Sequence, residues 1–182
     1  MVTPVGPLMI EHRLIERMIL QMKKQNEKFE TDEAVDLVFI DTAVDFIRNY
    51  ADKCHHGKEE DILFRDLKQK GLSEEHNRIM NELIQEHIYG RQTTGKLVDA
   101  RNAFIQGKKE ALKTIIETMK ELMNFYPKHI EKEDRHFFLP IMRYFTKEEQ
   151  NAMLHEEYEF DREFIHNLYK RMVEKIEKEA SS

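Results

Sequence analysis

Residues 54–64 read CHHGKEEDILF and residues 128–138 read KHIEKEDRHFF, so the second stretch repeats the chemistry of the first. A shift of 74 residues places His55 on His129 and Glu59 on Glu133. A His and a Glu four residues apart lie one above the other on a helix, with about 5–6 Å between their Cβ atoms. Each stretch therefore predicts a helix that presents one imidazole and one carboxylate in the same direction.

Two further histidines complete the repeat. His12 lies 43 residues before His55, and His87 lies 42 residues before His129. In both cases a glutamate directly precedes the first histidine of the pair. Imidazole nitrogens and carboxylate oxygens are the ligands of non-haem iron, manganese or zinc in proteins. A repeat with this chemistry indicates a pseudo-symmetric site for two metal ions.

Composition narrows the class of protein. The chain has 182 residues, of which 35% are charged and 9% aromatic, with few Gly and Pro residues. These values favour a single, mostly helical domain over residues 1–182. The net charge of -6 combines interspersed charges of both signs, so no nucleic-acid partner is expected. No apolar run approaches the roughly 20 residues of a membrane span, and the single cysteine, Cys54, fits a reducing compartment. We therefore expect a cytoplasmic protein with no membrane partner.

Apolar residues at helical spacing predict four long helices with short connections. The predicted ranges are 7–29, 32–70, 73–105 and 108–145. Thr31 or Asp32 is the expected N-cap of the second helix, and Pro127 is expected to kink or restart the fourth. Thr146-x-x-Glu149 reads as a capping box that opens a fifth helix over about 147–178. The expected fold is all-α, an up-down-up-down four-helix bundle over about 7–145 with an additional C-terminal helix.

The predicted metal ligands lie on the inner stripes of these helices. On the second helix, an advance of about 100° per residue aligns His55 and Glu59 with the apolar line. We therefore expect the neighbouring His56 and Glu60 to face solvent or to support the ligands, and we leave coordination by this pair open. His136 is likewise left open, as a supporting residue or a seventh ligand. The predicted set is His12, His55, Glu59, His87, His129 and Glu133.

Burial of these residues calls for a cation. An unpaired buried carboxylate costs several kcal/mol unless it is neutralised or coordinated. If both glutamates bridge, they would hold two cations roughly 3.5–4 Å apart. Each cation would receive two nitrogens and two oxygens, which leaves positions for an oxo or hydroxo bridge and for a small exogenous ligand.

Four segments together resemble the hemerythrin-like superfamily of HHE cation-binding domains. They read GPLMIEHRLIERMI, CHHGKEEDILF, EHIYGR and HIEKEDRHFFLP, and they spread over residues 6–140. The resemblance implies a four-helix bundle with a carboxylate-bridged di-iron centre, whose ligand pattern falls on the six residues above. Oxygen-carrying hemerythrins have a further histidine where this chain has Arg91, and their last carboxylate is an Asp five residues after its histidine, whereas Glu133 follows at four.

These departures make the chain look like the iron-centre repair and stress-response branch of that superfamily, and like the hemerythrin domains of iron sensors. The leading hypothesis is a protein with two iron ions that senses or handles oxygen, nitric oxide, peroxide or iron itself. The alternatives are an oxygen-storage hemerythrin and a di-iron oxidase or peroxidase, so enzyme activity is left open. Manganese or zinc could replace iron, and the expected partner is a small diatomic ligand or peroxide. Arg91 is expected to pair with a carboxylate or to guard the entry path.

Overall fold

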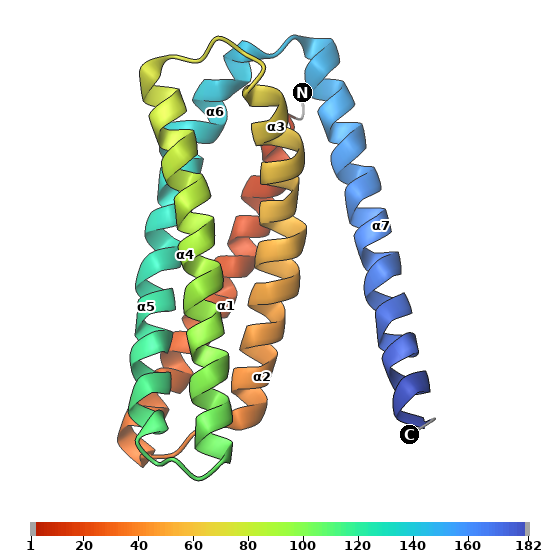
Figure 1. Cartoon of the computed structure of the whole chain (residues 1–182). Coiled ribbons are helices and arrows are strands. Elements are labelled where there is room, and N and C mark those ends of the chain that lie inside the picture. The colour runs from red at the N-terminus through yellow and green to blue at the C-terminus, as the bar shows by residue number, and fades with distance from the viewer. Residues whose placement is uncertain (1–2, 181–182) are drawn as a thin grey trace.

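The computed structural model describes residues 3–180, with the side chains of residue 166 and of residues 169–180 outside the description. Throughout the described residues the regular structure is helical, and four antiparallel rods form a bundle with one further helix beside it (Figure 1). The first and third rods are α1 (Val5–Asp32) and α4 (Glu74–Ile105). The second rod consists of α2 (Leu37–Asp45), η1 (Phe46–His56), η2 (Glu59–Phe64) and α3 (Arg65–Leu67). The fourth consists of α5 (Ala111–Lys132), η3 (Glu133–Phe137), α6 (Phe138–Ile141) and η4 (Met142–Tyr144), and α7 (Lys147–Ala180) follows. The expected four-helix bundle with a C-terminal helix is confirmed.

The predicted capping box is present at the start of α7. The Thr146 amide donates to Glu149 Oε2 at 2.8 Å, and the Glu149 amide donates to Thr146 Oγ1 at 3.2 Å. The third rod also starts as predicted, because Ser73 Oγ accepts from the amide of His76. These side chains satisfy amides that the first turn of a helix leaves unpaired. Both helix starts are therefore fixed locally by the sequence.

The second rod begins later than predicted. Asp36, and not Thr31 or Asp32, is its N-cap, and its carboxylate accepts from the amide of Phe39 at 3.0 Å. The reason is that α1 runs on to Asp32 and ends at Glu33, whose φ of 50° is in the left-handed region. Such a residue commonly follows the end of a helix. Thr31 and Asp32 therefore belong to the first helix.

The restart predicted at Pro127 does not occur, because α5 continues through it to Lys132. An interior proline removes one helical hydrogen bond and crowds the preceding turn. However, α5 packs along both α4 and α1, and this tertiary packing maintains the helix.

Three segments of π-helix interrupt the second and fourth rods near the predicted ligands. The segments η1 and η2 include His55 and Glu59, and η3 begins at Glu133. A π-helix has i→i+5 hydrogen bonds, so it winds more loosely than an α-helix, and it is frequently found at functional sites. Side chains in these segments therefore do not follow a regular 100° advance.

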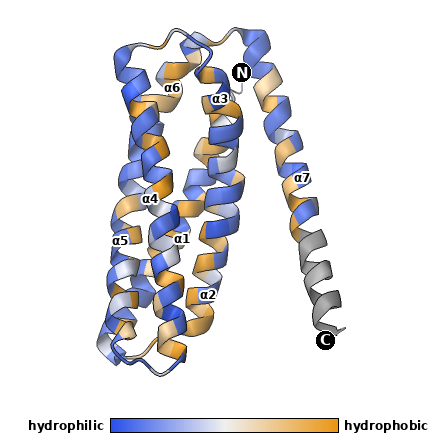
Figure 2. Ribbon diagram, in the orientation of Figure 1, coloured by the Kyte–Doolittle hydropathy of each residue, from blue (hydrophilic) through white to orange (hydrophobic). Residues whose placement is uncertain are grey.

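The apolar core is divided into two clusters, one in each half of the bundle, and polar and apolar residues alternate along the helices (Figure 2). One cluster contains Met22, Ile40, Leu97 and Leu122. The other contains Leu8, Leu63, Leu83 and Phe138. Each of the four rods thus contributes to both clusters, and the residues between them form a layer across the middle of the bundle.

The helix α7 packs against the second rod. Phe160 lies over Gly57, where an added Cβ would come within 2.8 Å of the phenyl ring. Arg65 donates two hydrogen bonds to Glu156, at 2.6 and 2.9 Å. The contact therefore covers the part of the second rod that includes His55 and Glu59. No helix within residues 3–180 is both long enough and apolar enough to cross a membrane.

Candidate metal centre

The structure brings all six predicted side chains together in the layer between the two apolar clusters. Each retains 1% or less of its accessible surface. The side chains come from all four rods, since α1 and α4 each supply one imidazole while the second and fourth rods each supply an imidazole and a carboxylate. We call this group the inner layer, and it consists of His12, His55, Glu59, His87, His129 and Glu133.

Glu59 lies between a histidine of each sequence half. Its Oε1 atom is 3.3 Å from His55 Nε2, and its Oε2 atom is 3.2 Å from His87 Nε2. Because the two oxygens face different imidazoles, this carboxylate is placed to bridge two cations.

Glu133 has the same relation to the other two histidines. Its Oε2 atom is 3.1 Å from His12 Nε2, and its Oε1 atom is 3.4 Å from His129 Nε2. The repeat read from the sequence is therefore reproduced as a pseudo-symmetric arrangement of four Nε2 atoms around two carboxylates.

The inner layer fits a cation by its unpaired polar atoms. The Nε2 atoms of all four histidines and both oxygens of each glutamate are buried without a hydrogen-bond partner. Their contacts of 3.1–3.4 Å lack hydrogen-bond geometry. Buried polar groups in native proteins are almost always paired. A bound cation would pair these nitrogen and oxygen atoms, because all of them can donate an electron pair to a metal.

The ligand atoms divide into two groups, each with its members within 4.8 Å of one another. One group holds two imidazoles and two carboxylates, and the other holds three imidazoles. The first group is His12, His55, Glu59 and Glu133, and the second is His56, His87 and His129. The four predicted histidines thus separate by sequence half, while His56 of the first half joins the second-half histidines His87 and His129.

His56 is a candidate ligand that the helical spacing missed. It is 2% exposed, and its ring stacks on His87 with 3.9 Å between centroids. Its Nδ1 atom is buried without a hydrogen-bond partner, and the nearest carboxylate oxygen, of Asp52, is 3.4 Å away. Burial and the charge of His87 hold the pKa of His56 well below its usual value, which favours the neutral imidazole that binds metals.

The expectation that His56 faces solvent is wrong for a physical reason. It rested on the 100° advance of an α-helix, whereas His55 and His56 end the π-helical segment η1. The looser winding turns both imidazoles toward the bundle axis. The adjacent histidines were visible in the sequence, but a π-helix has no spacing signal that would have shown both to be buried.

Every inner histidine is oriented by a carboxylate on its other nitrogen. Hydrogen bonds of 2.6–2.8 Å join each Nδ1 to an acidic residue. The pairs are His55 with Glu11, His12 with Asp134, His87 with Glu60, and His129 with Glu86. A carboxylate on Nδ1 fixes the ring and directs Nε2 to the metal. Glu60 thus bonds His87, a predicted ligand, as the supporting role expected for it would require.

These outer carboxylates belong to the repeat as well. Glu11 matches Glu86 at an offset of 75 residues, and Glu60 matches Asp134 at 74. The flanking identities of the two halves are thus explained by histidine orientation, a role that the spacing alone did not reveal.

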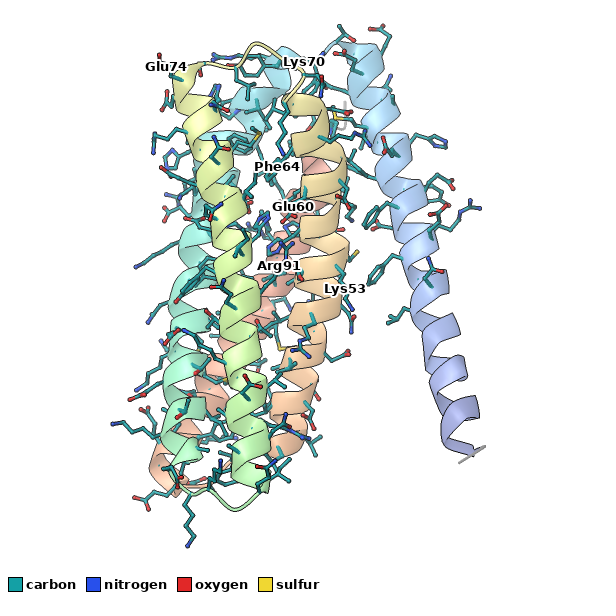
Figure 3. The ribbon with its side chains drawn as sticks, viewed as in Figure 1. Lys53, Glu60, Phe64, Lys70, Glu74 and Arg91 are labelled. Carbon is teal, nitrogen blue, oxygen red and sulfur yellow. The ribbon has the colours of Figure 1, made fainter. Side chains whose placement is uncertain are left out.

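Each outer carboxylate in turn contacts a basic side chain. Lys132 donates to Glu86 at 2.5 Å, and Lys58 donates to Glu11. The other two carboxylates are held by arginines, Asp134 by Arg13 and Glu60 by Arg91, which also contacts Asp52. Figure 3 shows Arg91 and Glu60 side by side between α4 and the second rod. The expectation that Arg91 pairs with a carboxylate is confirmed.

The electrostatics of the inner layer favour ionised carboxylates. Burial and the charge of Glu59 would raise the pKa of Glu133, but His129, His12 and His87 hold it at about 2. Burial alone would lower the pKa of His12, but the carboxylates of Asp134 and Glu133 raise it to about 10. Imidazolium protons thus balance the carboxylates, and metal binding would displace these protons.

Two other residues considered from the sequence lie outside the inner layer. His136 is exposed, so the structure supports neither a ligand nor a supporting role for it. Cys54 is buried, and its Sγ atom is 3.3 Å from Asp161 Oδ1 on α7. Burial raises the pKa of this thiol to about 12.

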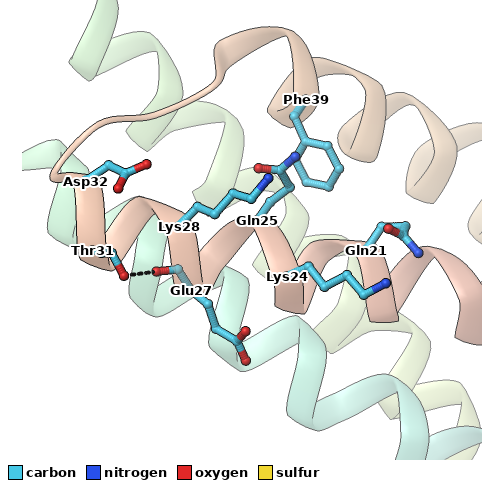
Figure 4. A pocket seen from close by; sticks show the side chains of 8 residues that line it. All are labelled: Gln21, Lys24, Gln25, Glu27, Lys28, Thr31, Asp32 and Phe39. Carbon is cyan, nitrogen blue, oxygen red and sulfur yellow. Dashed lines mark hydrogen bonds between the residues drawn. The ribbon is translucent and has the colours of Figure 1, made fainter.

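A hollow in the C-terminal half of α1 has a volume of about 530 Å³ (Figure 4). Its walls are mostly exposed, charged or amide side chains, and its recorded hydrogen bond is a local one from Thr31 Oγ1 to the Glu27 carbonyl. It lacks the buried, unpaired donors of the inner layer, so it does not compete as a functional site.

A four-helix bundle with a buried layer of imidazoles and carboxylates defines a cation-binding protein. The chain belongs to the hemerythrin family, because the model of the Hemerythrin HHE cation binding domain matches residues 3–138. This match covers all six residues of the inner layer.

The curated relatives have no assigned role. The chain is 25% identical over 142 residues to the uncharacterized protein Mb2018 of Mycobacterium bovis and to the uncharacterized protein Rv1995 of Mycobacterium tuberculosis. The matched region covers 78% of this chain and 54% of each relative, so the chain spans about half the length of the proteins it matches. No solved structure matches the chain at a significant level.

Proposed function

We propose that this chain is a non-haem di-iron protein that senses or handles a small oxidising ligand, a diatomic molecule or peroxide, through the inner layer. One observation carries the proposal. Two buried carboxylates each span histidines of both sequence halves, and each of the four inner-layer imidazoles is oriented by an outer carboxylate. Two cations in close proximity, held by nitrogen and oxygen donors, are the arrangement that this geometry supports.

The donor set favours iron over zinc. Structural zinc sites usually contain thiolates or four donors around a single ion, whereas the inner layer has carboxylates and imidazoles arranged for a pair. Manganese accepts similar donors and is the main competitor. Two iron ions bound here would supply a redox couple able to bind oxygen, nitric oxide or peroxide.

The chain's own residues determine how such a centre behaves. The outer carboxylates hold the four imidazoles in one orientation, and their basic partners prevent uncompensated negative charge from accumulating around the layer. The apolar clusters on both sides exclude water, which strengthens electrostatic interactions inside. The bundle therefore provides a rigid and preorganised site.

Iron loading under air tests the proposal. We expect about two iron ions per chain by elemental analysis, together with the near-ultraviolet and visible absorption of a ferric pair. Addition of about one equivalent of nitric oxide or hydrogen peroxide per iron pair to the reduced protein should change the visible absorption of that reduced protein. A colourless protein that holds less than about one iron ion per chain after iron-replete expression would refute the proposal.

Neighbouring histidines provide a sharper test of the ligand assignment. We expect His55→Ala to lower the iron content more than His56→Ala. The His55 ring is fixed by Glu11 and faces Glu59, while the Nδ1 atom of His56 has no hydrogen-bond partner. Elemental analysis of both variants, after their helical content is matched by circular dichroism, decides the order. An equal or larger loss in His56→Ala would show that the three-imidazole group dominates metal binding.

A further inference from the structure

A small cavity lies beside the inner layer, between the second rod and α4. Its volume is about 80 Å³, well above the roughly 10–15 Å³ that one water molecule needs. It is lined by Ile47, Arg48, Asp52, His56, Gly90, Arg91, Thr94 and Tyr126. His56 forms its inner wall and also stacks on the metal-site residue His87, so the cavity adjoins the three-imidazole group.

The equivalent space in the other half of the repeat is filled. An offset of 75 residues matches Gly90 and Thr94 of α4 with Ile15 and Ile19 of α1. Both isoleucines are buried in the core, with 1% and 7% of their surfaces exposed. Where α1 has two branched apolar side chains, α4 has Gly90, over which the Phe125 ring packs, and Thr94, whose smaller side chain leaves space.

The second and fourth rods show the same difference. An offset of 74 residues matches Arg48 with Leu122 and His56 with Ile130. Leu122 and Ile130 are buried core residues, with 0% and 3% exposure. The predicted ligand set is therefore surrounded asymmetrically, by packed apolar side chains in one half and by a cavity with both apolar and polar walls in the other.

An ion pair closes the outer side of the cavity. Arg91 Nε donates to Asp52 Oδ1 at 2.7 Å, and Arg91 Nη2 donates to Glu60 Oε1 at 2.8 Å. Arg91 is 39% exposed at its side chain and Asp52 is 22% exposed, so the pair is at the surface. Arg48 adds a second exposed guanidinium at the same rim. The rim thus combines two arginines with the carboxylates of Asp52 and Glu60, so the opening has little net charge and admits small anions as well as neutral ligands.

We propose that this cavity is the site at which a ligand of two or three heavy atoms, anionic or neutral, reaches the metal centre, and that Arg91 controls its entry. The inference rests on the proposed function and adds one thing to it, namely the half of the repeat at which the ligand binds. In the half that contains Ile15 and Ile19, the matching positions are filled by buried core side chains. The ligand therefore approaches the cation held by the second-half histidines.

Azide association with the iron-loaded protein tests the gate. The arginines Arg91 and Arg13 are a matched pair, because each holds the outer carboxylate of an inner histidine, but only Arg91 borders the cavity. We expect Arg91→Ala to raise the association rate of azide about fivefold in stopped-flow absorption, as the loss of a half-exposed ion pair permits. In Arg13→Ala the rate should not rise. Equal rates in both variants, or a rise in both, would overturn the proposal.

A second test needs no metal. Thr94→Ile places in α4 the residue that α1 has at the matching position, and it should fill the cavity. Xenon binding to the metal-free protein, followed by the 129Xe chemical shift, should be observed in the unmodified chain and lost in this variant. Thr93→Val, a change at a neighbouring buried position outside the cavity, is the control and should retain xenon. Xenon binding that persists in Thr94→Ile would place the space elsewhere and refute the proposal.

The two inferences fail in different ways. A chain that binds no iron refutes the proposed function, whereas a chain that binds iron and azide but shows no difference between Arg91→Ala and Arg13→Ala refutes the assignment of the cavity alone.

Discussion

The pair Glu11 and Lys58 and the pair Glu86 and Lys132 have the same sequence relation to the metal centre but different surroundings. Each glutamate bonds the Nδ1 atom of an inner histidine at 2.8 Å. Lys58 is nevertheless 1% exposed, whereas Lys132 is 27% exposed. The covering element is α7, which contributes Asp161 as a second partner of Lys58 at 2.8 Å. The two halves of the repeat thus share the same contacts between glutamate, histidine and lysine. Only the contacts in the first half are covered by α7, which lowers their exposure to water.

That change has energetic consequences, because α7 also buries a carboxylate. Glu157 is 3% exposed, and neither of its oxygens has a hydrogen-bond partner. Burial, opposed by the charge of Lys58, raises its pKa to about 8. The charged groups under α7 are therefore more buried than the pair Glu86 and Lys132, and their protonation affects stability more strongly.

The largest expected effect concerns the inner layer, where the two halves should behave alike. Glu59→Ala and Glu133→Ala should each leave one metal ion or none, because each carboxylate spans histidines of both halves. Elemental analysis after iron loading measures this. Full occupancy by two ions in either variant would show that the affected carboxylate does not bridge.

The next effect is a difference in stability between substitutions of Lys58, which α7 covers, and of Lys132, which it does not cover. Lys58→Met leaves Glu11, which is 14% exposed, without its cation and removes a partner of the half-exposed Asp161, and it should lower the free energy of unfolding by about 3 kcal/mol. Lys132→Met removes the partner of a more exposed carboxylate, and it should cost less than about 1 kcal/mol. Urea unfolding of the metal-free proteins measures both. Similar losses would mean that α7 does not change the surroundings of Lys58.

The buried carboxylate on α7 should make stability depend on pH. With a pKa of about 8, Glu157 stays protonated in the folded chain at pH values where the unfolded chain has lost that proton. The folded state then binds the extra proton, so this group makes stability fall as the pH rises toward 8. Glu157→Gln should remove about 3 kcal/mol of that fall between about pH 5 and pH 8.

The measurement is the difference in urea unfolding free energy between the metal-free chain and the variant at several pH values. Glu163→Gln, at an exposed position of the same helix, is the control and should follow the unmodified chain. A variant whose difference from the unmodified chain is constant over this range would contradict the burial of Glu157.

The smallest effect concerns the fit of α7 on the second rod. In Gly57→Ala the new Cβ would come within 2.8 Å of the Phe160 ring, which must shift, so a loss of about 1 kcal/mol is expected. Gly95→Ala meets nothing within 4 Å and lies inside α4, so it should stabilise the chain by about 0.5–1 kcal/mol. Thermal unfolding compares the two. A stabilising Gly57→Ala would show that α7 does not pack closely there.

The sequence predicted the bundle because apolar spacing, the Ser73 cap and the Thr146 capping box are local signals that the tertiary structure retains. It also brought the six inner residues to one layer, since a duplicated pattern limits which helix faces can converge. It could not predict the burial of His56, because the position depends on hydrogen bonds of a π-helix that no residue spacing reveals. It could not predict the cavity either, because the cavity depends on positions where the two halves differ, such as Thr94 and Ile19, and such a difference gives no signal of how neighbouring side chains fill the space.

The loosely wound segments η1, η2 and η3 have a mechanical consequence. They contain three of the six inner-layer residues, His55, Glu59 and Glu133, on backbone that is wound less regularly than an α-helix, while the two apolar clusters hold the rods together on either side of the layer. Cation uptake would then tighten the middle of the bundle and leave its ends unchanged. Backbone amide hydrogens in the η segments should thus exchange with solvent more slowly in the metal-loaded protein than in the metal-free protein. A bound metal pair would in this way stabilise the bundle that holds it.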